Sequence, residues 1–265
     1  QQKTIPPRGA FVNLVRLRAD INGREEQINV LVVSPELLFV QMARVFDFHE
    51  LVELGYELCG YYAISLSEKR GLLKRNPVTS PEELKSFCNL ADNVRGIKKA
   101  RRAARYVLAN SRSPKESQIS MLASLPRNLG GFEIGSPVLN QSIVMTGKVA
   151  RVLGASKCIP DIYWPEIKLA IEYDSNLEHL DVETHDHDAR KHNAYAMIGI
   201  ELRSVTASQV YDFGAIASIL REIREKQRQA SGKRRMRTSD AQLFGQEELH
   251  RWLLHGARHP RQTLA

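Results

Sequence analysis

Three carboxylate side chains lie near the ends of two short apolar segments in the middle of the sequence. Asp161 precedes the run Ile-Tyr-Trp, and Glu172 and Asp174 end the run that follows. If both runs are strands, the alternation of side chains along the second strand places Glu172 and Asp174 on one face. The ring of Tyr173 then points to the other face, so its backbone carbonyl lies near the acids. The short turn between the runs predicts an antiparallel hairpin in which Asp161 lies opposite the end of the second strand.

Carboxylates that converge in this way raise one another's pKa unless a cation neutralises them. Oxygen ligands that leave positions open for water suit Mg²⁺ or Mn²⁺. A divalent ion bound beside Asp161 would activate a water molecule and stabilise the charge that develops on a phosphodiester. The spacing of these acids therefore predicts a metal-dependent phosphodiester hydrolase.

Two further groups are candidates for the same site. His179 follows in a predicted loop, and near neutral pH a histidine there can move a proton or position the attacking water. A single histidine in an acidic stretch is also commonly just solvated. Glu116 completes the capping-box pattern that begins at Ser113. Its second interpretation is a further acid that faces the sheet, and both interpretations stay open.

The elements that must position these groups follow a regular order. A helix begins after Ser113 and ends near Pro126; strands are then expected over residues 132–139, 159–164 and 167–174, a helix over 184–198, a strand over 200–205 and a helix over 214–229. A hairpin followed by a crossover through a helix to another strand gives a mixed sheet flanked by helices. The sequence therefore predicts an α/β domain over residues 111–230.

The remaining residues are expected to form an N-terminal α+β domain, 1–110, and a basic linker with a short helix, 231–265. Two apolar segments flank Asn22-Gly23, which is a strong hairpin signal. A helix begins after Ser34 and extends to about Phe46. Further helices are expected over 49–58, after Ser80, over 98–109 and over about 241–254.

The charge of the chain is distributed unevenly along its length. The formal net charge of +8 divides into +5 over residues 1–110, −2 over 111–206 and +5 over 207–265. Basic flanks attract a polyanion such as nucleic acid, although an ordinary solvated surface explains them equally well. The side chains that would contact phosphate are Lys98, Lys99, Arg101, Arg102, Arg105, Arg190, Lys233, Arg234 and Arg235.

Composition excludes several other classes of protein. A chain of 265 residues with 43% hydrophobic residues is too apolar for wholesale disorder. No apolar run approaches the ~18 residues of a transmembrane helix, so no membrane association is expected. The polar N-terminus lacks the apolar run of a signal peptide. Three scattered cysteines show neither metal-site spacing nor a disulfide framework, so we expect a cytoplasmic protein.

These motifs resemble those of the PD-(D/E)XK nuclease superfamily, and within it the very-short-patch-repair (Vsr-like) endonucleases. The resemblance covers about residues 112–225. It rests on Ser113-Pro114-x-Glu116-Ser117, Pro160-Asp161-Ile-Tyr-Trp-Pro, Leu169-Ala-Ile-Glu172-Tyr-Asp174, His179, Asp188-Ala-Arg190, Gly199 and Leu202-Arg203-Ser-Val-Thr206. It implies a restriction-endonuclease-like mixed sheet in the order αβββαβα. Residues 30–110 are similar to the N-terminal half of bacterial proteins that include antitoxin-like regulators.

The resemblance also implies roles for the candidate residues. Asp161 would be the principal ligand of Mg²⁺ or Mn²⁺, with Glu172 or the Tyr173 carbonyl as the second. His179 would transfer a proton, and Glu116 would support the metal or its water. One departure is Asp174, which stands where the superfamily motif usually has a lysine. A second is Ser175, which replaces the usual glycine after the second acid.

Two classes of function follow from these observations. The first is a metal-dependent DNA endonuclease or nickase acting on double-stranded DNA, in repair or in defence against foreign DNA. The second is a DNA-binding transcriptional regulator or antitoxin that keeps the nuclease fold without its chemistry. An RNA substrate stays open, although no basic strand rich in aromatic residues is present to stack single-stranded bases. The target, the oligomeric state and any protein partner also stay open.

Overall fold

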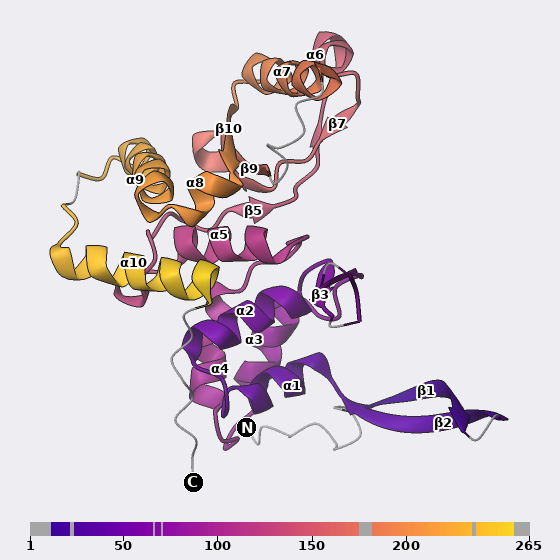
Figure 1. Ribbon diagram of the computed structural model, residues 1–265. Coiled ribbons are helices and arrows are strands. Elements are labelled where there is room, and N and C mark those ends of the chain that lie inside the picture. The colour runs from indigo at the N-terminus through magenta and orange to yellow at the C-terminus, as the bar shows by residue number, and fades with distance from the viewer. Residues whose placement is uncertain are drawn as a thin grey trace. The chain divides into compact units, whose positions relative to one another are not determined.

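The computed structural model describes residues 12–21, 24–65, 67–69, 71–174, 182–234 and 237–256 (Figure 1). Over 12–29 and 182–188 it describes the backbone alone. The chain is a mixed α/β protein. It separates into two compact units, Gln1–Ala109 and Asn110–Ala265.

The first unit combines an antiparallel hairpin with a group of helices. Its elements are β1 (Val12–Ile21), β2 (Arg24–Val33), α1 (Pro35–Met42), α2 (Phe48–Leu58), β3 (Tyr62–Ile64), β4 (Leu72–Lys74), α3 (Pro81–Leu90), α4 (Ile97–Ala103) and η2 (Ala104–Tyr106). Strand β1 pairs with β2 in the predicted hairpin, whose turn lies outside the described residues. Ser34 and Ser80 cap α1 and α3, as their side-chain chemistry predicts.

The basic helix of this unit is shorter than predicted. Helix α4 ends at Ala103, and after one 3₁₀ turn Val107 is extended. Val107 packs so closely on α2 that a Cβ on Gly55 would lie 2.3 Å from its Cγ2 atom. The chain leaves the helix because this contact buries Val107 completely. The periodicity of apolar residues along the sequence could not predict this contact between Val107 and α2.

The second unit is built on a four-stranded mixed sheet in the order β10-β9-β8-β5. Its strands are β5 (Val138–Leu139), β8 (Ile162–Trp164), β9 (Leu169–Asp174) and β10 (Glu201–Thr206). Strand β8 is antiparallel to both neighbours, and β9 is parallel to β10. Helix α7 (Val182–Met197) makes the crossover between the parallel strands. The predicted mixed sheet flanked by helices is therefore confirmed.

Helices cover both faces of this sheet (Figure 1). The other elements of the unit are α5 (Pro114–Ser124), η3 (Arg127–Leu129), β6 (Ile143–Val144), α6 (Gly147–Leu153), β7 (Lys157–Cys158), η4 (Pro165–Ile167), α8 (Ala207–Tyr211), α9 (Phe213–Ala230) and α10 (Asp240–His255). On one face Ala170 packs with Ala194 and Tyr195 of α7 and with Leu153 of α6. Helix α5 lies on the other side of the sheet. The sequence did not indicate β6, β7, α6 or α8.

The predicted strand 132–139 forms only at its last two residues. Phe132 and Ile134 are buried, but their N–H groups donate to the carbonyls of Leu122 and Ala123 at the end of α5. The N–H groups of this segment therefore form hydrogen bonds with the otherwise unpaired carbonyls at the end of a helix and do not pair with a strand at the edge of the sheet. In the sequence, an apolar run whose N–H groups bind the end of a helix has the same pattern as a strand, which is why a strand was predicted here.

Among the described residues, no helix combines the length and the apolar character needed to cross a bilayer.

Candidate active site

The hairpin of β8 and β9 brings Asp161 and Glu172 to neighbouring positions. Ile162 pairs with Ile171, so the next position on each strand places Asp161 opposite Glu172. The backbone N–H of Tyr173 donates to Asp161 Oδ2 at 2.8 Å. This bond holds the Asp161 carboxylate against the end of β9, where the alternation of strand residues predicted it.

Lys191 of α7 joins these acids, although sequence reasoning did not select it. Its Nζ lies 2.5 Å from Glu172 Oε2, and the two side chains are only 24% and 16% exposed. The charge of Lys191 also acts to lower the pKa of Asp161. Helical spacing was the available signal, because Lys191 precedes the buried Ala194 and Tyr195 by three and four residues and so shares their face.

Glu116 reaches the same site from the first turn of α5. It is 7% exposed, and its Oε2 accepts hydrogen bonds from the N–H of Arg112 at 2.9 Å and from Asn140 Nδ2 at 2.6 Å. Ser113 Oγ donates to Oε1 at 3.0 Å. The expected capping box is incomplete, because the carboxylate accepts from Arg112 N–H rather than from Ser113 N–H. Glu116 also lies close enough to Asp161 for the charge of Asp161 to raise its pKa, and its role as a further acid of the site stays a prediction.

Asn140 connects the two acids and was not predicted from the sequence. Its side chain donates to Glu116, and its backbone N–H donates to the carbonyl of Asp161 at 3.0 Å. Asn140 has a φ of +50°, a left-handed conformation that asparagine tolerates better than most residues. An isolated Asn after a two-residue strand carries no distinctive sequence signal.

The electrostatics of the site are those of a buried carboxylate, Glu116, close to a partly buried one, Asp161. Burial raises the pKa of Glu116, and the charge of Asp161 raises it further. Burial also raises the pKa of Asp161, although the Tyr173 N–H group, Lys191 and Arg112 act in the opposite direction. Each acid therefore binds a proton or a cation more readily than it would in water.

The donor set fits a divalent ion that keeps most of its water. Within the ranges that the structure describes, no three His, Cys, Asp or Glu side chains are grouped so that they could hold a metal. Mg²⁺ commonly needs only one or two carboxylates together with water or phosphate oxygens. Among the described residues, Asp161 accepts a hydrogen bond through Oδ2 alone, which leaves Oδ1 as the natural ligand. Glu116 is held by three donors, and Glu172 is held by Lys191.

Two other residues, Asp174 and His179, were predicted for the site. Asp174 is the last residue of β9, opposite Thr206 of β10 and on the same face as Glu172. His179 lies outside the described residues, so its predicted proton-transfer role stays a prediction.

The basic residues divide into structural and exposed groups. Lys99 Nζ donates to the Phe46 carbonyl at 2.7 Å, and Arg101 donates to the carbonyls of Cys88 and Ala91. The guanidinium of Arg102 lies 4.7 Å from the centre of the Phe48 ring. These three residues help to hold the first unit together.

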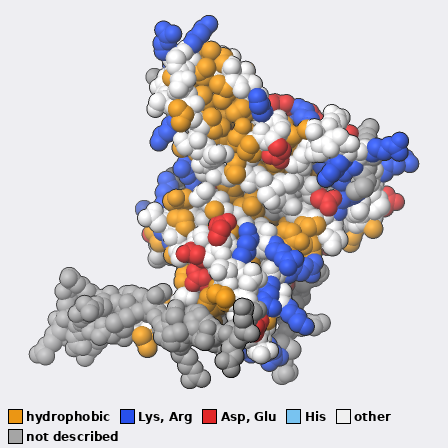
Figure 2. All heavy atoms as spheres, turned by 180° about the vertical axis from the view of Figure 1, so that it is seen from behind, with side chains coloured by type: hydrophobic (Ala, Val, Ile, Leu, Met, Phe, Trp, Pro, Cys, Tyr) orange, Lys and Arg blue, Asp and Glu red, His pale blue; other side chains and the backbone are white. Residues whose placement is uncertain are grey.

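The remaining predicted phosphate contacts are exposed or undescribed. Lys98, Arg105, Arg190, Lys233 and Arg234 are exposed, whereas Arg235 lies outside the described residues. On the face that Figure 2 shows, Lys and Arg side chains form several separate groups rather than one continuous surface.

We compared the chain with family models, with curated proteins and with solved structures, and none of them matches it.

Proposed function

We propose that this protein is a metal-dependent DNA endonuclease or nickase with a restriction-endonuclease-like domain in its second unit. The carrying observation is the convergence of Asp161, Glu172 and Lys191 at the ends of two paired strands, with Glu116 beside them. Carboxylates and an ammonium group at one strand edge are the groups that hydrolysis of a phosphodiester needs. The resemblance of the motifs to Vsr-like nucleases supports the same proposal.

Each residue has a distinct role in this proposal. Asp161 would hold Mg²⁺ or Mn²⁺ through Oδ1, with the Tyr173 carbonyl or Glu172 as the second ligand. A bound ion of this kind supplies an activated water and neutralises charge on the phosphate. Glu116 and Asn140 hold the Asp161 segment in place through their hydrogen bonds.

Lys191 would take the role of the lysine that the motif lacks at position 174. Its ammonium reaches the second acid of the motif from the crossover helix rather than from the strand. A positive charge at that place stabilises the negative charge that develops on the phosphate and orients the attacking water. The proposed nuclease therefore does not need a lysine at position 174.

The test is the conversion of supercoiled plasmid to nicked or linear DNA by the purified protein with Mg²⁺ or Mn²⁺. We expect Asp161→Asn and Lys191→Met to lower the rate at least about 100-fold, because each removes a group that acts in the transition state. Asp240→Asn makes the same change as Asp161→Asn at an exposed position of α10 and should cut like the wild type. Equal background cutting by wild type and Asp161→Asn would contradict the proposal.

The same variants test the second candidate function, a DNA-binding regulator without nuclease activity. Asp174 at the lysine position is the observation that favours it. In that case the protein would bind duplex DNA in a salt-dependent manner, with equal affinity in wild type and Asp161→Asn. Divalent ions would change neither the affinity nor the integrity of the DNA.

A further inference from the structure

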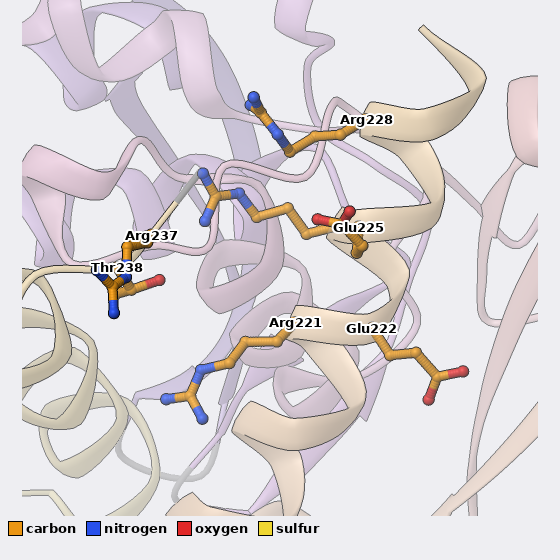
Figure 3. A pocket seen from close by; sticks show the side chains of 7 residues that line it. Arg221, Glu222, Glu225, Arg228, Arg237 and Thr238 are labelled. Carbon is orange, nitrogen blue, oxygen red and sulfur yellow. The ribbon is translucent and has the colours of Figure 1, made fainter. Parts of the chain in front are cut away.

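A polar cavity lies against the C-terminal half of α9, where arginines predominate. Its volume is about 690 Å³, and its lining residues are Arg221, Glu222, Arg224, Glu225, Arg228, Arg237 and Thr238. Figure 3 shows Arg221 and Arg228 extending from α9 towards the side where Arg237 and Thr238 lie. Four guanidinium groups therefore surround a space large enough for a small ligand.

The carboxylates near this cavity neutralise only part of the charge of the arginines. Glu222 leaves the opposite side of α9 (Figure 3), where its oxygens lie 2.5 and 2.8 Å from Arg203. Glu225 Oε1 accepts a hydrogen bond from Gln229. Glu133 lies at the edge, and its Oε2 is 3.8 Å from Arg224 Nη2. The cavity therefore keeps an excess of positive charge.

Buried guanidinium nitrogens around the cavity lack hydrogen-bond acceptors. Arg224 is 6% exposed, and its Nη2 atom makes no hydrogen bond. The Nε atoms of Arg127 and Arg228 are also buried and without an acceptor. Nearly all buried polar groups in proteins are hydrogen-bonded, so the unpaired nitrogens of the lining residues Arg224 and Arg228 call for an acceptor. Arg127 does not line the cavity, but its charge acts on Arg224.

The neighbouring arginines also act on one another. Burial and the positive charge of Arg127 lower the pKa of Arg224. Arg127 donates to the carbonyl of Arg237 at 3.0 Å, and Arg228 donates to the carbonyl of Arg234. These bonds hold the segment between α9 and α10 against the arginines but leave the three nitrogens above unpaired. An anion in the cavity would supply both the acceptors and the negative charge.

The cavity lies away from the candidate active site. Gln227 of α9 donates to Glu166 Oε1 in η4 at 2.7 Å. Element η4 joins the end of β8 to the start of β9, whereas Asp161 and Glu172 lie at the other end of the same strands. The arginines are therefore not part of the acidic site.

We propose that this cavity is a binding site for a small ligand with several phosphate groups, either a nucleoside triphosphate or an inorganic oligophosphate. Guanidinium groups form paired, charge-assisted hydrogen bonds with phosphate oxygens. Several arginines around a partly open cavity match a compact ligand of high charge density. The hydroxyl of Thr238 adds a neutral donor at the border. This site does not depend on the proposed nuclease activity.

Isothermal titration calorimetry with inorganic tripolyphosphate, in buffer with EDTA and about 0.15 M salt, tests the proposal. We expect saturable binding of one tripolyphosphate per chain. Arg221→Ala and Arg224→Met should each weaken it about tenfold or more, because each removes charged hydrogen bonds. Arg151→Ala removes the same charge from an exposed position of α6 and should leave the affinity unchanged within twofold.

Further titrations distinguish a nucleotide from an inorganic oligophosphate, and thermal unfolding shows whether each variant is folded. ATP that binds more tightly than tripolyphosphate would assign a nucleotide, and ATP that binds less tightly would assign the oligophosphate; adenosine should not bind. Thermal unfolding checks each variant, since tripolyphosphate should raise the Tm of the wild type but not that of Arg221→Ala or Arg224→Met. Absent binding, or equal affinity in all variants, would overturn the proposal. So would a DNA duplex that displaces tripolyphosphate and requires Arg221, because the cavity would then belong to a nucleic-acid surface.

Discussion

At the scale of single residues, Lys191 decides whether the buried acid of β9 is tolerated. A carboxylate that is 16% exposed loses most of its hydration, and only a close cation compensates for that loss. Lys191 supplies the cation at 2.5 Å, and its charge also reaches Asp161. The pair therefore supports the fold and organises the candidate site at the same time.

Removing Lys191 should destabilise the protein because it leaves Glu172 without this cation. We expect Lys191→Met to lower the free energy of unfolding by about 1–3 kcal/mol, less than for a fully buried pair because some exposure remains. The double variant Glu172→Gln/Lys191→Met should recover part of that loss, since no buried charge is left. Urea unfolding measures both, with Lys148→Met on the exposed face of α6 as a control. Equal loss in the single and double variants would show that the charge is not the cause.

At the scale of elements, α10 and the segment after α5 depend on close contacts that the sequence does not display. His250 of α10 is 2% exposed, and its ring Nε2 donates to the carbonyl of Val210 in α8 at 2.8 Å. At the end of α5, a Cβ on Gly131 would lie 1.9 Å from the carbonyl oxygen of Leu125. The first contact holds α10 against α8, and the second holds the chain after η3 against the end of α5.

Gly131→Ala should therefore be strongly destabilising. The added methyl group meets backbone, which cannot move aside as a flexible side chain can, so we expect a loss of about 2 kcal/mol or more. Gly245→Ala is the matched control, because its Cβ would meet nothing closer than 3.8 Å and alanine favours the helix. Chemical denaturation measures the free energy of unfolding of both variants. Equal values would show that the Leu125 carbonyl does not restrict the side chain at position 131.

His250 should make stability depend on pH. Burial lowers its pKa from the usual 6.5, although the bond to the Val210 carbonyl acts in the opposite direction. The unfolded chain therefore binds this proton at higher pH than the folded chain. The stabilisation is fully present above about pH 6.5 and is lost as the pH falls through the folded pKa.

His250→Gln should reduce that dependence, since glutamine stays neutral and can still donate to the carbonyl. Urea unfolding at about pH 7.5 and about pH 5.5 should show a smaller loss of stability in His250→Gln than in the wild type. The control is His192→Gln, which makes the same change at an exposed histidine of α7 and should behave like the wild type. An unchanged pH dependence in His250→Gln would show that another group is responsible.

At the scale of the whole molecule, the distribution of charge matters more than the net value of +8. Asp161, Glu172 and Asp174 lie at one strand edge of the second unit, and arginines of α9 line a separate cavity. Lys99 and Arg101 of α4 donate to backbone carbonyls of their own unit, whereas Lys98 and Arg102 of α4 and Arg105 of η2 are exposed. Within the second unit, the described residues therefore form two separate electrostatic sites, one acidic and one basic.

If duplex DNA contacts the exposed part of α4 and η2, its affinity should fall as the salt concentration rises. The logarithm of the association constant should then decrease linearly with the logarithm of the salt concentration. Each phosphate contact contributes about 0.9 to that slope, so Lys98→Ala/Arg105→Ala should reduce it by up to about 1.8. Fluorescence anisotropy with a labelled duplex measures the slope. Arg251→Ala, at an exposed arginine that is paired with Glu247 and Glu248, should leave it unchanged. An unaltered slope in the double variant would exclude these two residues from the DNA contact.

The sequence by itself determined the features that depend on local pattern. Two apolar runs joined by a short turn predicted the hairpin of β8 and β9 with Asp161 opposite the end of β9, and helical periodicity predicted the crossover helix and so the mixed sheet. Alternation predicted that Glu172 and Asp174 share a face, because strand side chains alternate regardless of what surrounds them.

Only the tertiary structure decided which distant groups complete each site. Lys191, Asn140 and the arginine cavity come from segments that meet through packing, and the short strand β5 follows a segment that instead satisfies the end of α5. Such contacts depend on burial and on unpaired backbone groups elsewhere in the chain. No local pattern carries that information, because the same lysine or arginine would be an ordinary solvated charge without its partners.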